Sequence, residues 1–97
     1  MDNRIFGYAR VSSADQNLGR QLDALARFPV QRSQIYADKA SGKDFKRPQY
    51  QRLLRRLREG DVLVIKSIDR LGRNYREVLD EWRRITVDRN AAIVVLD

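Results

Sequence analysis

The sequence contains no cysteine and no histidine. Without thiols there is no disulfide framework and no cysteine nucleophile, and without imidazoles there is no serine–histidine pair. Zinc sites built from thiolate and imidazole ligands are excluded as well. Any proton transfer in this protein must therefore use a carboxylate, water, lysine or arginine.

Long apolar runs are also missing, since no segment approaches the roughly 20 residues that a membrane span needs. No signal peptide is visible either, so we expect a cytoplasmic protein without membrane partners. The 97 residues, 42% of them hydrophobic, suit a single domain with one modest core.

Positive charge is in excess, with a net charge of +7. More than half of the lysines and arginines lie between residues 43 and 84. Such a distribution fits either a solvated face with ordinary ion pairs or a surface that faces phosphates. Charge alone does not decide between the two.

Hydrophobic periodicity predicts four strands and three helices in alternation. The strands are expected at 4–11, 34–38, 61–66 and 91–96, and the helices at 15–27, 48–59 and 74–88. Pro48 suits the first position of its helix, and Gly60 the C′ position after it. In the third helix we expect Val78, Leu79, Trp82 and Ile85 to face inward, with Trp82 largely buried.

This order favours right-handed crossovers, and hence an α/β fold of three layers. We expect a mostly parallel four-stranded sheet in the order 2-1-3-4, with helices on both faces. The apolar run 91–96 would be exposed at a sheet edge. We therefore expect a chain truncated from a longer protein, the alternative being an edge that a partner covers.

Polar residues follow three of the expected strands, where the carboxyl ends of a parallel sheet share one edge. Side chains there that can donate to an anion are Arg10, Ser12, Arg47, Lys66, Ser67, Arg70 and Arg73. Several arginines that converge on one phosphoryl group would stabilise its transition state, because their forked donors match phosphate oxygens.

Each of these residues also has an ordinary structural interpretation. Ser12 could cap the following helix, although Ser13 fits a capping box with Gln16 better. Arg10 could extend past the sheet edge into solvent.

Three further residues have such alternatives as well. Asp69 could pair with Arg73, four residues on, at the start of a helix. Arg47 could be a solvated loop residue, and Gln21 an exposed polar position.

Together, several strings in this order resemble the catalytic domain of the serine recombinases, the resolvase/invertase family of site-specific DNA recombinases. They extend over nearly the whole chain: Tyr8-Ala9-Arg10-Val11-Ser12, Gln21, Asp38-Lys39-Ala40-Ser41-Gly42, Arg47, Glu59-Gly60-Asp61 and Asp69-Arg70-Leu71-Gly72-Arg73. The resemblance implies a resolvase-like fold and an enzyme that cuts DNA through a phosphoserine link and rejoins the strands without metal or cofactor.

The resemblance also assigns roles. Ser12 would be the nucleophile, with phosphate-binding groups at Arg10, Arg47, Arg70 and Arg73. Asp69 would organise arginines or assist proton transfer at the leaving oxygen, and Gln21 would support the site. On the same basic edge, DNA contacts are expected from Lys43, Lys46 and Lys66.

Family members act on DNA as dimers that pair into tetramers, through a long helix and a DNA-binding region that these residues do not resemble. We therefore expect residues 1–97 to form one catalytic domain that is inactive by itself. Two other hypotheses are a non-catalytic module that binds nucleic acid or phosphate through the same basic edge, and a structural core without a site. A covalent DNA adduct would distinguish the first hypothesis, and salt-dependent DNA binding would separate both from the third.

Overall fold

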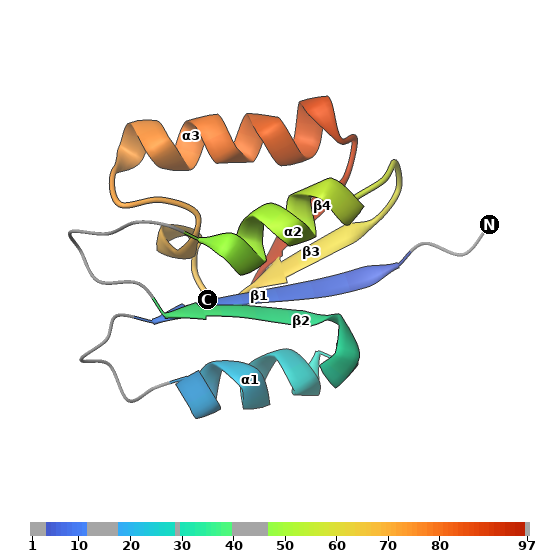
Figure 1. Ribbon diagram of the computed structural model, residues 1–97, viewed down its shortest axis with the longest axis vertical. Helices are drawn as coiled ribbons and strands as arrows, with labels where there is room; N and C mark the ends of the chain where they lie inside the picture. The colour runs from blue at the N-terminus through green and yellow to red at the C-terminus, as the bar shows by residue number, and fades with distance from the viewer. Residues whose placement is uncertain (1–3, 12–17, 29, 40–46, 97) are drawn as a thin grey trace.

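The computed structural model describes residues 4–11, 18–28, 30–39 and 47–96. One sheet holds four parallel strands in the order β2-β1-β3-β4. The strands are β1 (Ile5–Val11), β2 (Ile35–Lys39), β3 (Val62–Ile65) and β4 (Ala92–Val95). Helix α1 (Leu18–Arg27) covers one face, and α2 (Pro48–Arg56) and α3 (Tyr75–Arg83) cover the other (Figure 1). The predicted three-layer architecture and strand order are confirmed.

The central strand β1 is buried on both faces, as its alternation predicts. Phe6 and Tyr8 pack into the core under α2 and α3. Ala9 joins the core under α1. Gly7 also faces α1, and a Cβ there would lie only 3.2 Å from Leu25 Cδ1. β1 is thus packed on both faces, and this packing fixes the position of Arg10 near its carboxyl end.

The helix ends differ from the predictions. Pro48 does occupy the first turn of α2, but the helix ends at Arg56, because Leu57 is already extended with φ −66° and ψ 134°. Gly60 has φ 86°, so it serves the turn that leads into β3 and is not the C′ residue of α2. After α3, residues Arg84–Asp88 form a π-helical turn. Local periodicity does not encode such endings.

The inward face predicted for α3 is only partly right. Ile85 is buried, whereas Leu79 is 39% exposed and Trp82 is half-buried. Leu79 and Trp82 line an open, apolar cavity of about 510 Å³ together with Ile68 and Tyr75. The apolar stripe of α3 therefore extends beyond its line of contact with the core. Within the described segments, no helix has the length and apolarity to cross a membrane.

Candidate active site

The site lies where β1 extends beyond its neighbour β3. The register of β1 with β3 ends at Tyr8 and Ile65, whereas its register with β2 continues to Val11 and Lys39. A short 3₁₀ helix, η2 (Ile68–Arg70), follows β3. Arg10 Nη2 donates a hydrogen bond to the main-chain oxygen of Asp69 at 3.1 Å. The two strings singled out in the sequence thus meet at the carboxyl edge of the sheet.

Three guanidinium groups gather at this edge, from β1, from the start of α2 and from η2. Arg47 Nη1 donates to the main-chain oxygen of Arg70 at 3.3 Å. Burial lowers the pKa of Arg10; nearby Tyr8 acts in the opposite sense, and the charges of Arg70 and Arg47 lower the pKa further. Among the described residues, Arg70 Nε is buried and makes no hydrogen bond. Like charges crowded in this way are stabilised when an anion binds between them.

Asp69 organises this group through both its main chain and its side chain. Its main-chain oxygen holds Arg10, as described above. Its carboxylate accepts a hydrogen bond from Ser67 Oγ at 2.5 Å and lies 3.9 Å from Arg70 Nε. The Asp69 side chain is 70% exposed.

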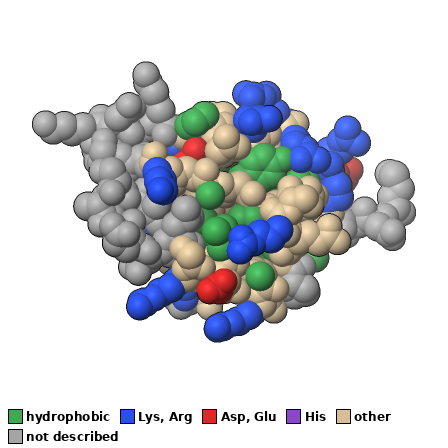
Figure 2. Space-filling view, turned by 60° about the horizontal axis from the view of Figure 1, so that its bottom comes forward, with side chains coloured by type: hydrophobic (Ala, Val, Ile, Leu, Met, Phe, Trp, Pro, Cys, Tyr) green, Lys and Arg blue, Asp and Glu red, His purple; other side chains and the backbone are tan. Residues whose placement is uncertain are grey.

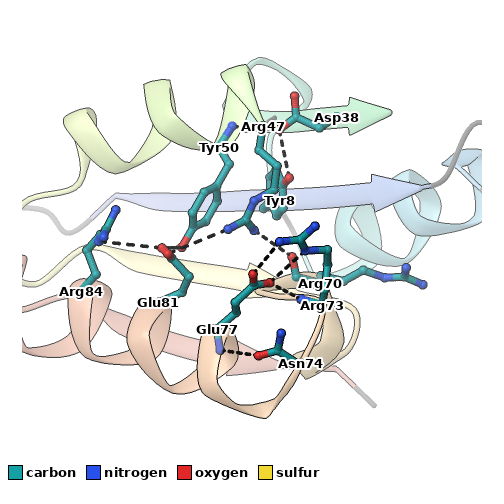
Figure 3. A network of polar contacts seen from close by, with 10 residues as sticks. All are labelled: Tyr8, Asp38, Arg47, Tyr50, Arg70, Arg73, Asn74, Glu77, Glu81 and Arg84. Atoms are coloured by element: carbon teal, nitrogen blue, oxygen red, sulfur yellow. Dashed lines mark hydrogen bonds and ion pairs between the residues drawn. The ribbon is translucent and has the colours of Figure 1, made fainter. Parts of the chain in front are cut away.

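Arg73 lies beside these arginines but is held by Glu77 (Figure 3). Glu77 accepts hydrogen bonds from Arg73 N at 2.8 Å and from Arg73 Nη2 at 2.9 Å. These contacts lower the pKa of Glu77 from its ordinary 4.5 to about 2 and raise the pKa of Arg73. The i,i+4 ion pair of this segment is therefore Arg73–Glu77, and the alternative pairing of Asp69 with Arg73 is wrong.

Gln21 is buried on α1 and clamps the main chain of Arg10. Its Oε1 accepts from Arg10 N at 3.3 Å, and its Nε2 donates to Arg10 O at 3.2 Å. The interpretation of Gln21 as an exposed polar residue is wrong. Its amide instead satisfies main-chain groups of β1 beyond the end of β3, and so fixes the strand segment that carries Arg10.

The predicted DNA-contacting lysines are placed only in part. Lys66 lines a hollow with Arg20, Asp23 and Arg27 of α1. Figure 2 shows basic side chains spread round the α1 face rather than gathered in one patch. Three of the predicted site residues lie outside the described segments: Ser12, Lys43 and Lys46.

The sequence analysis assigned no structural role to Asp38, which anchors the start of α2. Asp38, at the end of β2, accepts hydrogen bonds from Tyr8 OH at 2.9 Å, Gln49 N at 3.1 Å and Tyr50 N at 3.0 Å. It therefore caps α2 from another element, while Arg47 at the N-cap makes no capping bond with its side chain. The available signal was a carboxylate near the end of a strand, shortly before a helix start.

Glu81 was missed as well. Glu81 on α3 accepts a hydrogen bond from Tyr50 OH on α2, and the two residues are 31 positions apart in the sequence. No local spacing indicates that contact.

The chemistry available here is the binding of a phosphoryl group and the stabilisation of its charge. Arginine forks present paired donors to phosphate oxygens. In the described part of the chain, no cluster of three or more acidic residues could hold a metal ion.

Comparison with known proteins agrees with this fold. The family model "Resolvase, N terminal domain" matches residues 5–97. The chain is 49% identical over 85 residues to the Tn501 resolvase of Pseudomonas aeruginosa, which covers 88% of this chain and 41% of the relative. It is 38% identical over 94 residues to a resolvase/recombinase of Pseudomonas putida, which covers 97% of this chain and 51% of the relative.

A solved structure is similar too. The crystal structure of the N-terminal catalytic domain of TP901-1 integrase superimposes with a TM-score of 0.77 at 26% identity. The match covers 97% of this chain and 77% of that one. The chain spans about two fifths to half of the length of the curated relatives described here. With its matched sequence and its shared fold, the chain belongs to the resolvase N-terminal domain family.

Proposed function

We propose that the chain is the catalytic domain of a site-specific DNA recombinase in which Ser12 attacks a DNA phosphodiester. The observation that carries this proposal is the gathering of Arg10, Arg47 and Arg70 at the edge where β1 leads toward Ser12. A histidine-free chain has no imidazole base. Arginine charge must therefore stabilise the attacking oxygen and the phosphoryl group together.

The proposed step is an in-line transfer. The Ser12 Oγ–phosphorus bond forms as the bond from phosphorus to a deoxyribose oxygen breaks. The Ser12 proton passes to water, and the leaving oxygen gains a proton from water, a transfer that the exposed Asp69 carboxylate assists. The phosphoserine ester keeps the energy of the broken bond, so reversal of the same step with a new deoxyribose hydroxyl rejoins the DNA.

Each remaining residue has a role in this scheme. The three gathered arginines bind the phosphoryl oxygens, and Gln21 keeps Arg10 in place through its main chain. Arg73 joins them once DNA competes with Glu77 for its guanidinium. Lys43, Lys46 and Lys66 would contact the DNA backbone at either side.

We propose that the domain acts within a longer protein that forms dimers, which pair into tetramers on DNA. The exposed apolar cavity along α3 supports a surface that another segment covers. The 97 residues alone should leave DNA uncut. Light scattering of the longer protein, free and with DNA, tests the assembly; a monomer on cleaved DNA would contradict it.

The decisive experiment uses a chimera in which residues 1–97 are joined to the remainder of the Tn501 resolvase and are mixed with that relative's recombination-site DNA. A denaturing gel should show protein attached to cleaved DNA, and Ser12→Ala should remove the adduct. Arg70→Ala should slow its formation by about 10²–10³-fold, as for other preorganised donors. Arg32→Ala, an exposed arginine on another edge, is the control and should match the parent chimera.

Two outcomes would contradict the proposal. An adduct that persists in Ser12→Ala would move the nucleophile to Ser13 or Ser41. Salt-sensitive DNA binding without any adduct, while the relative's own protein cleaves the same DNA, would favour the non-catalytic binding module.

A further inference from the structure

Arg47 is the most enclosed arginine of the group, with only 7% of its surface exposed. Its guanidinium carbon lies 4.0 Å from the centre of the Tyr50 ring. Its Nη2 lies 4.0 Å from Glu81 Oε2, and its Nη1 reaches the main-chain oxygen of Arg70. A buried charge is costly unless partners compensate it, so this side chain depends on these neighbours for its position.

Glu81 is itself fixed from several directions (Figure 3). Tyr50 OH donates to Glu81 Oε1 at 2.8 Å, and Arg84 Nε lies 3.9 Å from the same oxygen. Burial raises the pKa of Tyr50, and the Glu81 carboxylate raises it further. The Tyr50 hydroxyl therefore stays protonated and remains a donor at any pH near neutrality.

The placement of Glu81 is unusual for packing alone. Its side chain is 13% exposed on a helix that packs apolar residues against the core. An apolar residue there could pack α3 against α2 without the cost of burying a carboxylate. The carboxylate instead faces a guanidinium whose carbon lies over the Tyr50 ring.

We propose that Tyr50 and Glu81 are positioning residues that orient Arg47 for the phosphoryl group without touching DNA themselves. The ring fixes the plane of the guanidinium, and the carboxylate fixes its rotation within that plane. Two-pronged phosphate binding requires both, because the paired donors must align with paired oxygens. This inference rests on the proposed function for its catalytic part, while the placement of Arg47 can be tested separately.

The test uses two substitutions that alter single features. Tyr50→Phe keeps the ring and removes the hydroxyl that holds Glu81. Glu81→Gln keeps an oxygen for Tyr50 and removes the charge that faces Arg47. Asp80→Asn is the matched control, since it removes an exposed carboxylate from the adjacent position of α3.

The first readout does not need activity. In the 97-residue chain, NMR should show the Arg47 side-chain protons shifted by the ring current of Tyr50. Glu81→Gln should move these shifts toward those of free arginine, with the urea midpoint little changed, whereas Asp80→Asn should leave them in place. Unchanged Arg47 shifts in both Glu81→Gln and Tyr50→Phe would overturn the inference.

The second readout is a double-mutant cycle in the chimera. Glu81→Gln should slow adduct formation about tenfold at saturating DNA, with little change in DNA affinity. In an Arg47→Lys background it should have less than a twofold further effect, because it acts through Arg47. A full tenfold effect in that background would overturn the positioning role. If the unaltered chimera forms no adduct, the proposed function fails, while the NMR result still decides how Arg47 is held.

Discussion

At the scale of single residues, two arginines of the site donate hydrogen bonds to main-chain oxygens. Arg10 donates to the oxygen of Asp69, and Arg47 donates to the oxygen of Arg70. A carbonyl oxygen fixes the direction of a guanidinium and leaves its charge in place, whereas a bidentate carboxylate would cancel that charge. The arginines are therefore held in place and remain attractive to a phosphate.

Asp38 provides a residue-level test of how this arrangement is supported. Asp38→Ala leaves a buried Tyr8 hydroxyl and two amide donors of α2 without their acceptor. The free energy of unfolding should fall by about 2–3 kcal/mol, the usual cost of unsatisfied buried groups and a lost helix cap. Urea unfolding followed by circular dichroism measures it.

Asp38→Asn is the graded comparison, since it keeps one acceptor oxygen and should lose less stability. An alanine variant within about 0.5 kcal/mol of the parent protein would show that Asp38 does not anchor α2.

At the scale of elements, the loop between η2 and α3 depends on close approach at Gly72. A Cβ on Gly72 would lie 2.6 Å from Glu77 Cβ and 2.8 Å from Val78 N. Gly72→Ala should therefore push the loop away from α3 and lower the free energy of unfolding by about 1–3 kcal/mol. Because Asp69, Arg70 and Arg73 belong to the same segment, adduct formation should slow as well.

Gly19→Ala is the matched control for this change. Gly19 lies in α1, and among the described residues outside its own helix backbone no heavy atom comes within 4 Å of where the alanine methyl would lie. Alanine there should raise the free energy of unfolding by about 0.5–1 kcal/mol, because it reduces the freedom of the unfolded chain. Equal effects at the two glycines would refute the close-approach argument.

The elements also show how far sequence patterns reach. The two-residue alternation of β1 and the apolar run of β3 predicted the strands, because each pattern is local and follows from burial. The meeting of Arg10 with Asp69 followed from topology, since parallel strands share their carboxyl edge. The helix ends could not be predicted from local patterns, and neither could the hydrogen-bond partners of Gln21 and Asp38, because these depend on which distant groups lack partners after folding.

At the scale of the whole molecule, the two ends of the sheet use charge differently. The carboxyl end gathers arginines. At the amino end, buried Asp61 accepts hydrogen bonds from Arg4 N at 3.2 Å, Arg4 Nη2 at 2.9 Å and Arg58 N at 2.9 Å. This single carboxylate ties the starts of β1 and β3 to the segment after α2, so the fold is anchored away from the site.

The lowered pKa values of Asp61 and Glu77 predict how the free energy of unfolding changes with pH. Burial alone would raise the pKa of Asp61, but the hydrogen bonds from Arg4 and Arg58 outweigh it and lower that pKa; the pKa of Glu77 falls to about 2. Between its lowered folded value and its ordinary unfolded value, each carboxyl binds fewer protons when folded. The stabilisation that these two carboxylates contribute is therefore fully present above about pH 5. It is lost as the pH falls through about 4.5 toward about 2.

Urea unfolding between about pH 2.5 and pH 6 measures this slope. Asp61→Asn should be less stable than the parent protein near neutrality. It should also show a shallower loss toward the acid end, because it removes one of the two carboxyls, among the described residues, whose pKa is lowered in the folded protein. Glu77→Gln should flatten the slope by removing the other. Parallel curves for the parent and Asp61→Asn would mean that the Asp61 carboxylate is not the group that acid titrates, and that another contact fastens the amino end of the sheet.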